Sequence, residues 1–165
     1  MLRSAEVGLL ATVGCVENVK VYLKAVNIGV LSTGNELVSA TIERLPKGKI
    51  RDSNKLMLTS IIRETSLRLN IAEQINVIDL GIIKDDGAAI DEAIKRATTD
   101  CQIIVTSGGV SMGEMDLIKP YIEQAGKVFF GRLNMKPGKP TTFGVIGNTL
   151  MFALPGNPVS SFVSA

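Results

Sequence analysis

The chain has 165 residues, of which 45% are hydrophobic and 21% are charged, and its formal net charge is +2. These proportions are ordinary for one globular domain, so they exclude a disordered segment, a fibre and a surface that binds nucleic acid through bulk positive charge. No apolar run approaches the roughly 18 to 20 residues of a membrane span, which predicts a cytoplasmic protein with no membrane span.

The chain contains no histidine, which excludes Ser-His-Asp and Cys-His catalysis and zinc sites with imidazole ligands. Its two cysteines, Cys15 and Cys101, cannot form a disulfide framework and lack Cys-x-x-Cys spacing. Both are interpreted as small core residues in a reducing compartment. Enzyme chemistry in this chain must use carboxylates, lysines, hydroxyls and backbone amides, and carboxylates favour Mg²⁺.

Strands and helices alternate along most of the chain. Residues 1–25 form no neat part of this pattern and are interpreted as the tail of a preceding domain or a linker, so the α/β domain is expected at 26–165. Buried strands are predicted at 26–32, 75–80 and 102–106, and helices at about 53–69, 86–97 and 115–124. This alternation predicts a parallel sheet with right-handed crossovers.

The last part of the chain has a different pattern. Strands are predicted at 127–133, 140–146 and 149–154, and a helix begins at about Val159. The last two strands are separated by Gly147-Asn148, a two-residue turn typical of hairpins. We therefore expect a three-layer α/β sandwich whose central sheet is mostly parallel, with an antiparallel portion near the C-terminus.

Apolar spacing predicts which residues pack into the core. On the first helix they are Leu56, Ile61, Ile62 and Leu69. On the second helix they are Ile90, Ala93, Ile94 and Ala97, and on the late strands Phe129, Phe130, Phe143 and Phe152.

Polar residues and glycines follow three of the predicted strands. These loops are residues 33–36, 84–86 and 106–116. Because the carboxyl ends of parallel strands meet at one edge of a sheet, where ligands bind, the three loops are expected to converge. Each contains a carboxylate, and Glu36, Asp85 and Asp116 are candidate ligands for Mg²⁺. The alternatives are helix capping by Asp85 and simple solvent exposure of the others.

The third loop has the composition of an anion site. Gly108 and Gly109 allow backbone amides to approach a ligand, and the Ser111 hydroxyl can donate to an oxyanion. Glycines also serve tight turns, and the Gly-Lys-Ser/Thr of a Walker loop is missing. Residues 52–54 are explained as a helix cap whose polar groups can also face the cleft, and Asn157 in Pro-Gly-Asn-Pro can donate to a ligand or simply form a turn.

The segment Met135-Lys136-Pro137-Gly138-Lys139-Pro140 presents two cations from a stiff loop. Two prolines fix the backbone and Gly138 permits a sharp turn, which suits a compact oxyanion such as molybdate, sulfate or phosphate. The alternative is a rigid, solvated turn whose lysines are incidental.

Five motifs, read in chain order, resemble the molybdopterin molybdotransferase family. They are Ser-Thr-Gly-Asn-Glu-Leu at 32–37, Gly-Lys-Ile-Arg-Asp-Ser-Asn at 48–54, Thr-Ser-Gly-Gly-Val-Ser-Met-Gly at 106–113, Lys-Pro-Gly-Lys-Pro at 136–140 and Leu-Pro-Gly-Asn-Pro-Val-Ser at 154–160. The asparagine of the first motif and the whole second motif are most similar to the gephyrin and plant E domains. The resemblance implies the central molybdopterin-binding domain of such an enzyme, without its C-terminal domain.

The resemblance also implies an activity and a set of site residues. The family inserts molybdate into adenylylated molybdopterin in a Mg²⁺-dependent reaction. By motif position, catalysis is assigned to Asp85, Asp116 and Lys136, and metal binding to Glu36, Asp85 and Asp116. Binding of the pterin and of molybdate is assigned to Thr33, Gly34, Gly108, Gly109, Ser111, Lys139, Pro140 and Asn157.

Three other interpretations stay open. A molybdopterin adenylyltransferase shares the fold, but it typically has Gly-Gly-Thr-Gly where this chain has Gly-Gly-Val-Ser-Met-Gly. A gephyrin-like scaffold would cluster receptors and have cytoskeletal partners or a fused adenylyltransferase domain. A catalytically dead homologue is the third, although both lysines and all three acids are present. Family members dimerise through several domains, so a homodimer is expected of the full-length protein.

Overall fold

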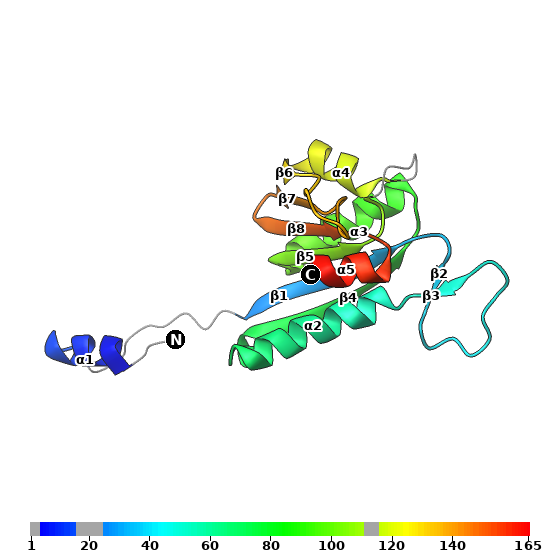
Figure 1. Cartoon of the computed structure of the whole chain (residues 1–165). Coiled ribbons are helices and arrows are strands. Elements are labelled where there is room, and N and C mark those ends of the chain that lie inside the picture. Colours follow the sequence, from blue (N-terminus) through cyan, green and yellow to red (C-terminus); the bar gives the residue numbers. More distant parts are fainter. Residues whose placement is uncertain (1–3, 16–24, 111–115) are drawn as a thin grey trace.

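A mixed sheet lies at the centre of the computed structural model, which describes residues 4–15, 25–110 and 116–165 (Figure 1). The described part has a six-stranded sheet in the order β4-β1-β5-β8-β7-β6. In that order the strands are Ile75–Ile83, Val26–Thr33, Ile103–Ser107, Thr149–Leu154, Thr142–Ile146 and Lys127–Phe130.

The pairing of the strands confirms the mixed sheet. β1 pairs in parallel with β4 and β5, and β5 pairs in parallel with β8. β7 pairs antiparallel with both β8 and β6. The hairpin between β7 and β8 turns at Gly147, whose φ of +57° is a conformation that favours glycine.

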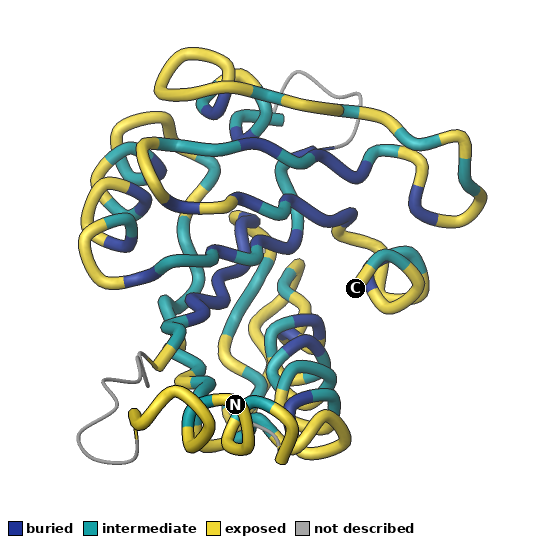
Figure 2. The backbone as a smooth tube through the Cα atoms, turned by 90° about the vertical axis from the view of Figure 1, so that its left-hand side faces the viewer, coloured by how far each residue is buried: buried dark blue, intermediate teal, exposed yellow. Residues whose placement is uncertain are grey.

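Helices cover both faces of this sheet, which gives three layers (Figures 1 and 2). One face carries α2 (Asn54–Arg68) and α5 (Pro158–Ser164), and the other carries α3 (Gly87–Asp100) and α4 (Ile118–Ala125). The smaller elements are α1 (Ser4–Thr12), the 3₁₀ turn η1 (Ala72–Gln74) and a short parallel pair formed by β2 (Leu37–Val38) and β3 (Ile50–Arg51). α1 has no buried residue and lies apart from the sheet (Figure 1).

The core follows from strands that are apolar on both faces. In β1, Val30 packs with Leu58 on the α2 side, while Leu31 packs with Ile94 on the α3 side. Burial continues without a break from Ile28 to Gly34, as expected for a strand covered on both faces. The predicted positions Ile90, Ile94 and Ala97 of α3 are confirmed as buried.

Some of the predicted core residues are exposed. Leu56 and Leu69 of the α2 region are 58% and 59% exposed, because the inner stripe of the helix is formed by Leu58 together with Ile62, which was predicted correctly. Phe129 is 57% exposed and Phe130 38%, because β6 is the edge strand and has a neighbour on one side only. Phe143 and Phe152 are half-buried and stack with ring centroids 4.8 Å apart.

Several predicted boundaries also shift by two or three residues, among them the end of β4 at Ile83 and the end of α3 at Asp100. α4 begins at Ile118 rather than near residue 115, and β6 ends at Phe130 rather than 133. Among the helices in the described part of the chain, none combines the length and the hydropathy of a membrane span.

Candidate functional site

The loops that follow β1, β5 and β8 touch one another. The backbone N–H of Gly108 donates to the Leu154 carbonyl at 3.0 Å. A Cβ atom at Gly108 would lie 2.6 Å from the carbonyl oxygen of Thr33, and one at Gly156 would lie 3.6 Å from Cα of Gly108. The loops after β1 and β5 therefore converge as predicted, the loop after β8 joins them, and the closeness of the backbones explains why position 108 is glycine.

Buried polar side chains at the start of α2 form hydrogen bonds at the same edge of the sheet. The Ser32 hydroxyl donates to Oδ1 of Asp52 at 3.1 Å, and that oxygen also accepts from the backbone N–H of Lys55. The Asn54 amide donates to Oγ of Ser107 at 2.7 Å and to the Gly156 carbonyl at 2.8 Å. Thus Asp52 caps the helix, and Asn54 joins it to the loops after β5 and β8.

Three buried oxygens near this edge have no hydrogen-bond partner in the described part of the chain. They are Oγ1 of Thr33, Oδ2 of Asp52 and Oδ1 of Asn54. Thr33 is 4% exposed, Asp52 3% and Asn54 8%. Because buried polar groups are nearly always hydrogen-bonded, these three oxygens are available to a partner that is not among the described residues, such as a ligand or water.

The loop after β4 lies against the loop after β1. The backbone N–H of Asn35 donates to Oδ2 of Asp85 at 3.0 Å, and the N–H of Asp85 donates to Oδ1 of Asn35 at 3.3 Å. The carboxylate of Glu36 lies over Gly34, where an added Cβ atom would be 2.8 Å from Oε2. Two of the predicted acids, Glu36 and Asp85, therefore come from adjacent loops.

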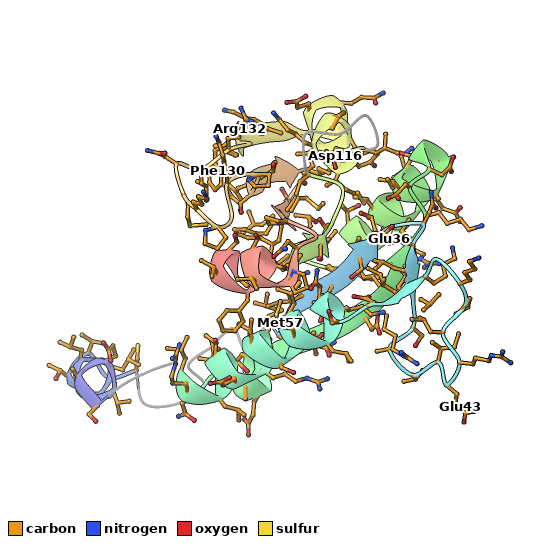
Figure 3. All side chains as sticks on the ribbon, turned by 45° about the vertical axis from the view of Figure 1, so that its right-hand side comes forward. Glu36, Glu43, Met57, Asp116, Phe130 and Arg132 are labelled. Atoms are coloured by element: carbon orange, nitrogen blue, oxygen red, sulfur yellow. The ribbon has the colours of Figure 1, made fainter. Side chains whose placement is uncertain are left out.

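The third predicted acid, Asp116, is half-buried and lies just before α4. Figure 3 shows it apart from Glu36, which lies beyond the carboxyl end of β1. The described residues contain no group of three or more His, Cys, Asp or Glu side chains that could hold a metal ion. The assignment of all three acids to Mg²⁺ stays a prediction, and Ser111 lies outside the described residues.

The loop that carries Lys136 and Lys139, called the lysine loop below, borders a separate open pocket of about 720 Å³. Residues 134–140 and Ser160 line this pocket. Its shape is held by the Leu133 N–H, which donates to the Lys139 carbonyl, and by the Thr141 hydroxyl, which donates to the Gly138 carbonyl. Lys136 and Lys139 are exposed, and neither ammonium has a hydrogen-bond or ion-pair partner among the residues described. The loop is thus a fixed scaffold that carries two unpaired cations.

The first turn of α5 connects the lysine pocket to the carboxyl edge. Asn157 caps this helix by accepting from the Ser160 N–H at 3.1 Å, while Gly156 approaches Gly108 and Ser160 lines the lysine pocket. No hydrogen bond or ion pair in the described regions joins the lysine loop to Glu36 or Asp85. The predicted residues therefore form two neighbouring clusters that α5 connects.

Another open pocket of about 610 Å³ lies between α3 and α4, where Tyr121 donates to Asp91 at 3.2 Å. None of the predicted site residues lines it. Its walls are the outer surfaces of two helices rather than strand ends, so the carboxyl edge is the better candidate for chemistry in a sheet of this type.

Comparisons with known proteins show the family to which the fold and the motifs belong. Residues 29–165 match the family described as "Probable molybdopterin binding domain". The chain is 40% identical to a gephyrin from Dictyostelium discoideum, over 97% of this chain and 25% of that protein. It is 38% identical to a molybdopterin molybdenumtransferase from Haemophilus influenzae, over 99% of this chain and 38% of that protein.

A solved structure gives the same result for the fold. The molybdopterin biosynthesis moea protein from Pyrococcus horikosii has a TM-score of 0.69 at 34% identity, covering 97% of this chain and 37% of that one. The chain thus spans between a quarter and two fifths of the length of these relatives. Because the family match extends over residues 29–165, from the first strand of the sheet to the last helix, the chain belongs to the molybdopterin-binding domain family of molybdenum cofactor biosynthesis.

Proposed function

We propose that the chain is the central domain of a molybdopterin molybdotransferase, which inserts molybdate into adenylylated molybdopterin. The observation that carries this proposal is the pair of clusters joined by α5. One cluster offers two unpaired cations on a fixed loop, and the other offers buried, unsatisfied acceptors beside glycine-rich loops. The relatives that bear the name molybdopterin molybdenumtransferase support the same activity.

The lysine loop is the proposed molybdate site. Molybdate is a compact dianion, and the ammonium groups of Lys136 and Lys139 would neutralise its two charges. Because the loop is held by hydrogen bonds to its backbone, only the lysine side chains, and not the loop itself, must become ordered when they bind the anion. In this assignment Lys136 has the catalytic role, because it orients the oxyanion toward the pterin, and Pro140 shapes the wall of the pocket.

The carboxyl edge is the proposed site of the adenylylated pterin. Gly108 and Gly109 let the loop after β5 pack closely against the end of β1 and against α4, because a side chain at either position would collide with Thr33 or Ile118. The free oxygens of Asp52 and Asn54 would accept hydrogen bonds from N–H groups of the ligand. From the sequence, residues 52–54 are explained as a helix cap whose polar groups can also face the cleft.

Mg²⁺ is also part of the proposal. It commonly takes one or two protein carboxylates and completes its shell with water and substrate phosphate oxygens. Glu36 and Asp85, on adjacent loops, fit that requirement, and Asp116 is the third candidate ligand and catalytic acid. When bound, the ion would supply positive charge against the adenylate phosphate. A cytoplasmic location, a homodimer and receptor or cytoskeletal partners stay predictions from the family resemblance.

Calorimetric titration with molybdate tests the anion site. We expect binding by the full-length protein, and loss of at least about tenfold in affinity in Lys136→Ala with Lys139→Ala, because both cations are removed. The matched control is Lys47→Ala with Lys95→Ala, which changes net charge equally but far from the loop. Sulfate at the same ionic strength measures selectivity. Equal affinity in the two double variants would place the anion elsewhere.

A further inference from the structure

The tight turn after β1 determines where the Glu36 side chain begins. The Leu37 N–H donates to the Gly34 carbonyl at 3.2 Å, so Asn35 and Glu36 are the central residues of a β-turn. Turns of types I and II differ mainly in the orientation of the central peptide, here the one between Asn35 and Glu36. Glu36 does not have the positive φ that a type II turn would need.

The oxygen of this central peptide is held by a lysine from another segment. Nζ of Lys49 donates to the Asn35 carbonyl at 2.6 Å, and the next residue, Ile50, donates its N–H to the Glu36 carbonyl at 2.9 Å. Lys49 is half-buried, and its ammonium forms no ion pair with a carboxylate in the described ranges. The Lys49 ammonium therefore binds a backbone carbonyl. It does not bind the Glu36 or Asp85 carboxylate, although both belong to the same pair of loops.

The other side of the turn is joined to Asp85. The backbone N–H of Asn35 donates to the Asp85 carboxylate, and the Asn35 side chain accepts from the Asp85 N–H. A continuous set of hydrogen bonds thus runs from Lys49 through Asn35 to Asp85. Glu36 follows directly from the peptide that Lys49 holds.

We propose that Lys49 is a positioning residue for the site, because its ammonium fixes the Asn35–Glu36 peptide and thereby the placement of the Glu36 and Asp85 carboxylates. Hydrogen bonds with a charged donor or acceptor are about twice as strong as those between neutral groups, so the turn is held by two such bonds, from Lys49 to the Asn35 carbonyl and from the Asn35 N–H to Asp85. The inference rests on the proposed function for what the site binds, but the order of the turn is measurable without any ligand.

The experiment compares Lys49→Met, Lys49→Arg and Lys47→Met in the full-length protein. Met retains the length of the side chain without a donor, whereas Arg retains the donor. Lys47 lies on the same loop, is exposed and has no hydrogen-bond partner in the described regions, so Lys47→Met removes the same charge without removing a hydrogen bond.

The first measurement is hydrogen–deuterium exchange of a peptide that covers residues 33–38. We expect exchange about 5- to 10-fold faster in Lys49→Met, partial recovery in Lys49→Arg and no change in Lys47→Met. The melting temperature should change little, because the lost hydrogen bond joins two exposed loops rather than core elements. Unchanged exchange in Lys49→Met would overturn the positioning role.

The second measurement is steady-state molybdate insertion. Misplaced carboxylates should lower kcat by about tenfold in Lys49→Met and leave KM within about twofold, because positioning acts on the reacting geometry more than on affinity. Faster exchange with unchanged kcat would overturn the link between this turn and the site. If the wild-type protein shows no insertion at all, the proposed function fails, and the exchange comparison still decides whether Lys49 orders the turn.

Discussion

The contact between Gly108 and β1 predicts a large penalty for adding a single methyl group. Gly108 has a φ of +93°, and a Cβ atom there would lie 2.6 Å from the Thr33 carbonyl oxygen and 3.0 Å from its Oγ1. Thr33 ends β1, which is hydrogen-bonded to a strand on each side, so its backbone cannot move away easily. Gly108→Ala is therefore destabilised in two ways. Alanine disfavours the backbone conformation at this position, and its methyl group collides with the Thr33 backbone.

The size of the effect follows from these two contributions. A non-glycine residue in the left-handed region costs about 1 to 2 kcal/mol. Overpacking against a rigid neighbour costs about 1 to 3 kcal/mol more. Because about 1 kcal/mol shifts the melting temperature by about 2 to 4 °C in a chain of this size, we expect a decrease of about 10 °C.

Gly81→Ala is the matched control for this prediction. Gly81 has a similar φ of +86°, but nothing lies within 4 Å of an added Cβ atom. Its melting temperature should fall by about 5 °C, from the backbone contribution alone. Scanning calorimetry of both variants in the same buffer measures the difference. Equal decreases would refute the close contact between the loops after β1 and β5.

Two other predictions concern the α2 side of the sheet. Partial burial acts to raise the pKa of Asp79, but hydrogen bonds from Lys55 at 2.9 Å and from the Gly81 N–H at 2.8 Å outweigh it and lower that pKa. The stabilisation is therefore present above the ordinary pKa of 3.8 and is lost as pH falls further, so Asp79→Asn should melt below wild type at pH 7 and match it in strong acid. A difference in melting temperature between Asp79→Asn and wild type that stays the same at every pH would contradict this. Leu58→Ala should destabilise by about 2 to 4 kcal/mol in urea and Leu56→Ala by less than about 0.5, since Leu58 is 1% exposed and Leu56 58%; equal losses would refute the assigned inner face of α2.

The sheet could be predicted because its strands carry their own signals. The continuous apolar run from Val26 indicates burial on both faces, and Gly147-Asn148 indicates a hairpin. The prediction for the inner face of α2 was right for Ile62 but wrong for Leu56 and Leu69, because leucines occur on more than one face of this helix. Only the packing against β1 and β8 selects Leu58 over Leu56.

The site was predictable as an edge of the sheet but not as a set of contacts. The strand ends and their polar loops follow from chain order, and Thr33, Gly34, Gly108 and Gly109 lie where that reasoning placed them. In contrast, the partners of Asn54 are 53 and 102 residues away, so local sequence suggests only a helix cap. The contact between Lys49 and Asn35 likewise depends on how the β2 and β3 segments return to the end of β1.

The most direct test of the proposed function is molybdate-dependent release of AMP from adenylylated molybdopterin by the full-length protein. AMP and the molybdenum-containing product are quantified by chromatography, with and without molybdate, for wild type and for Lys136→Ala with Lys139→Ala. The proposal predicts release by wild type that requires molybdate and falls by at least about 100-fold in the double variant, because two cations that hold the oxyanion are lost. Release by the double variant at the wild-type rate, or none by wild type with molybdate present, would contradict it.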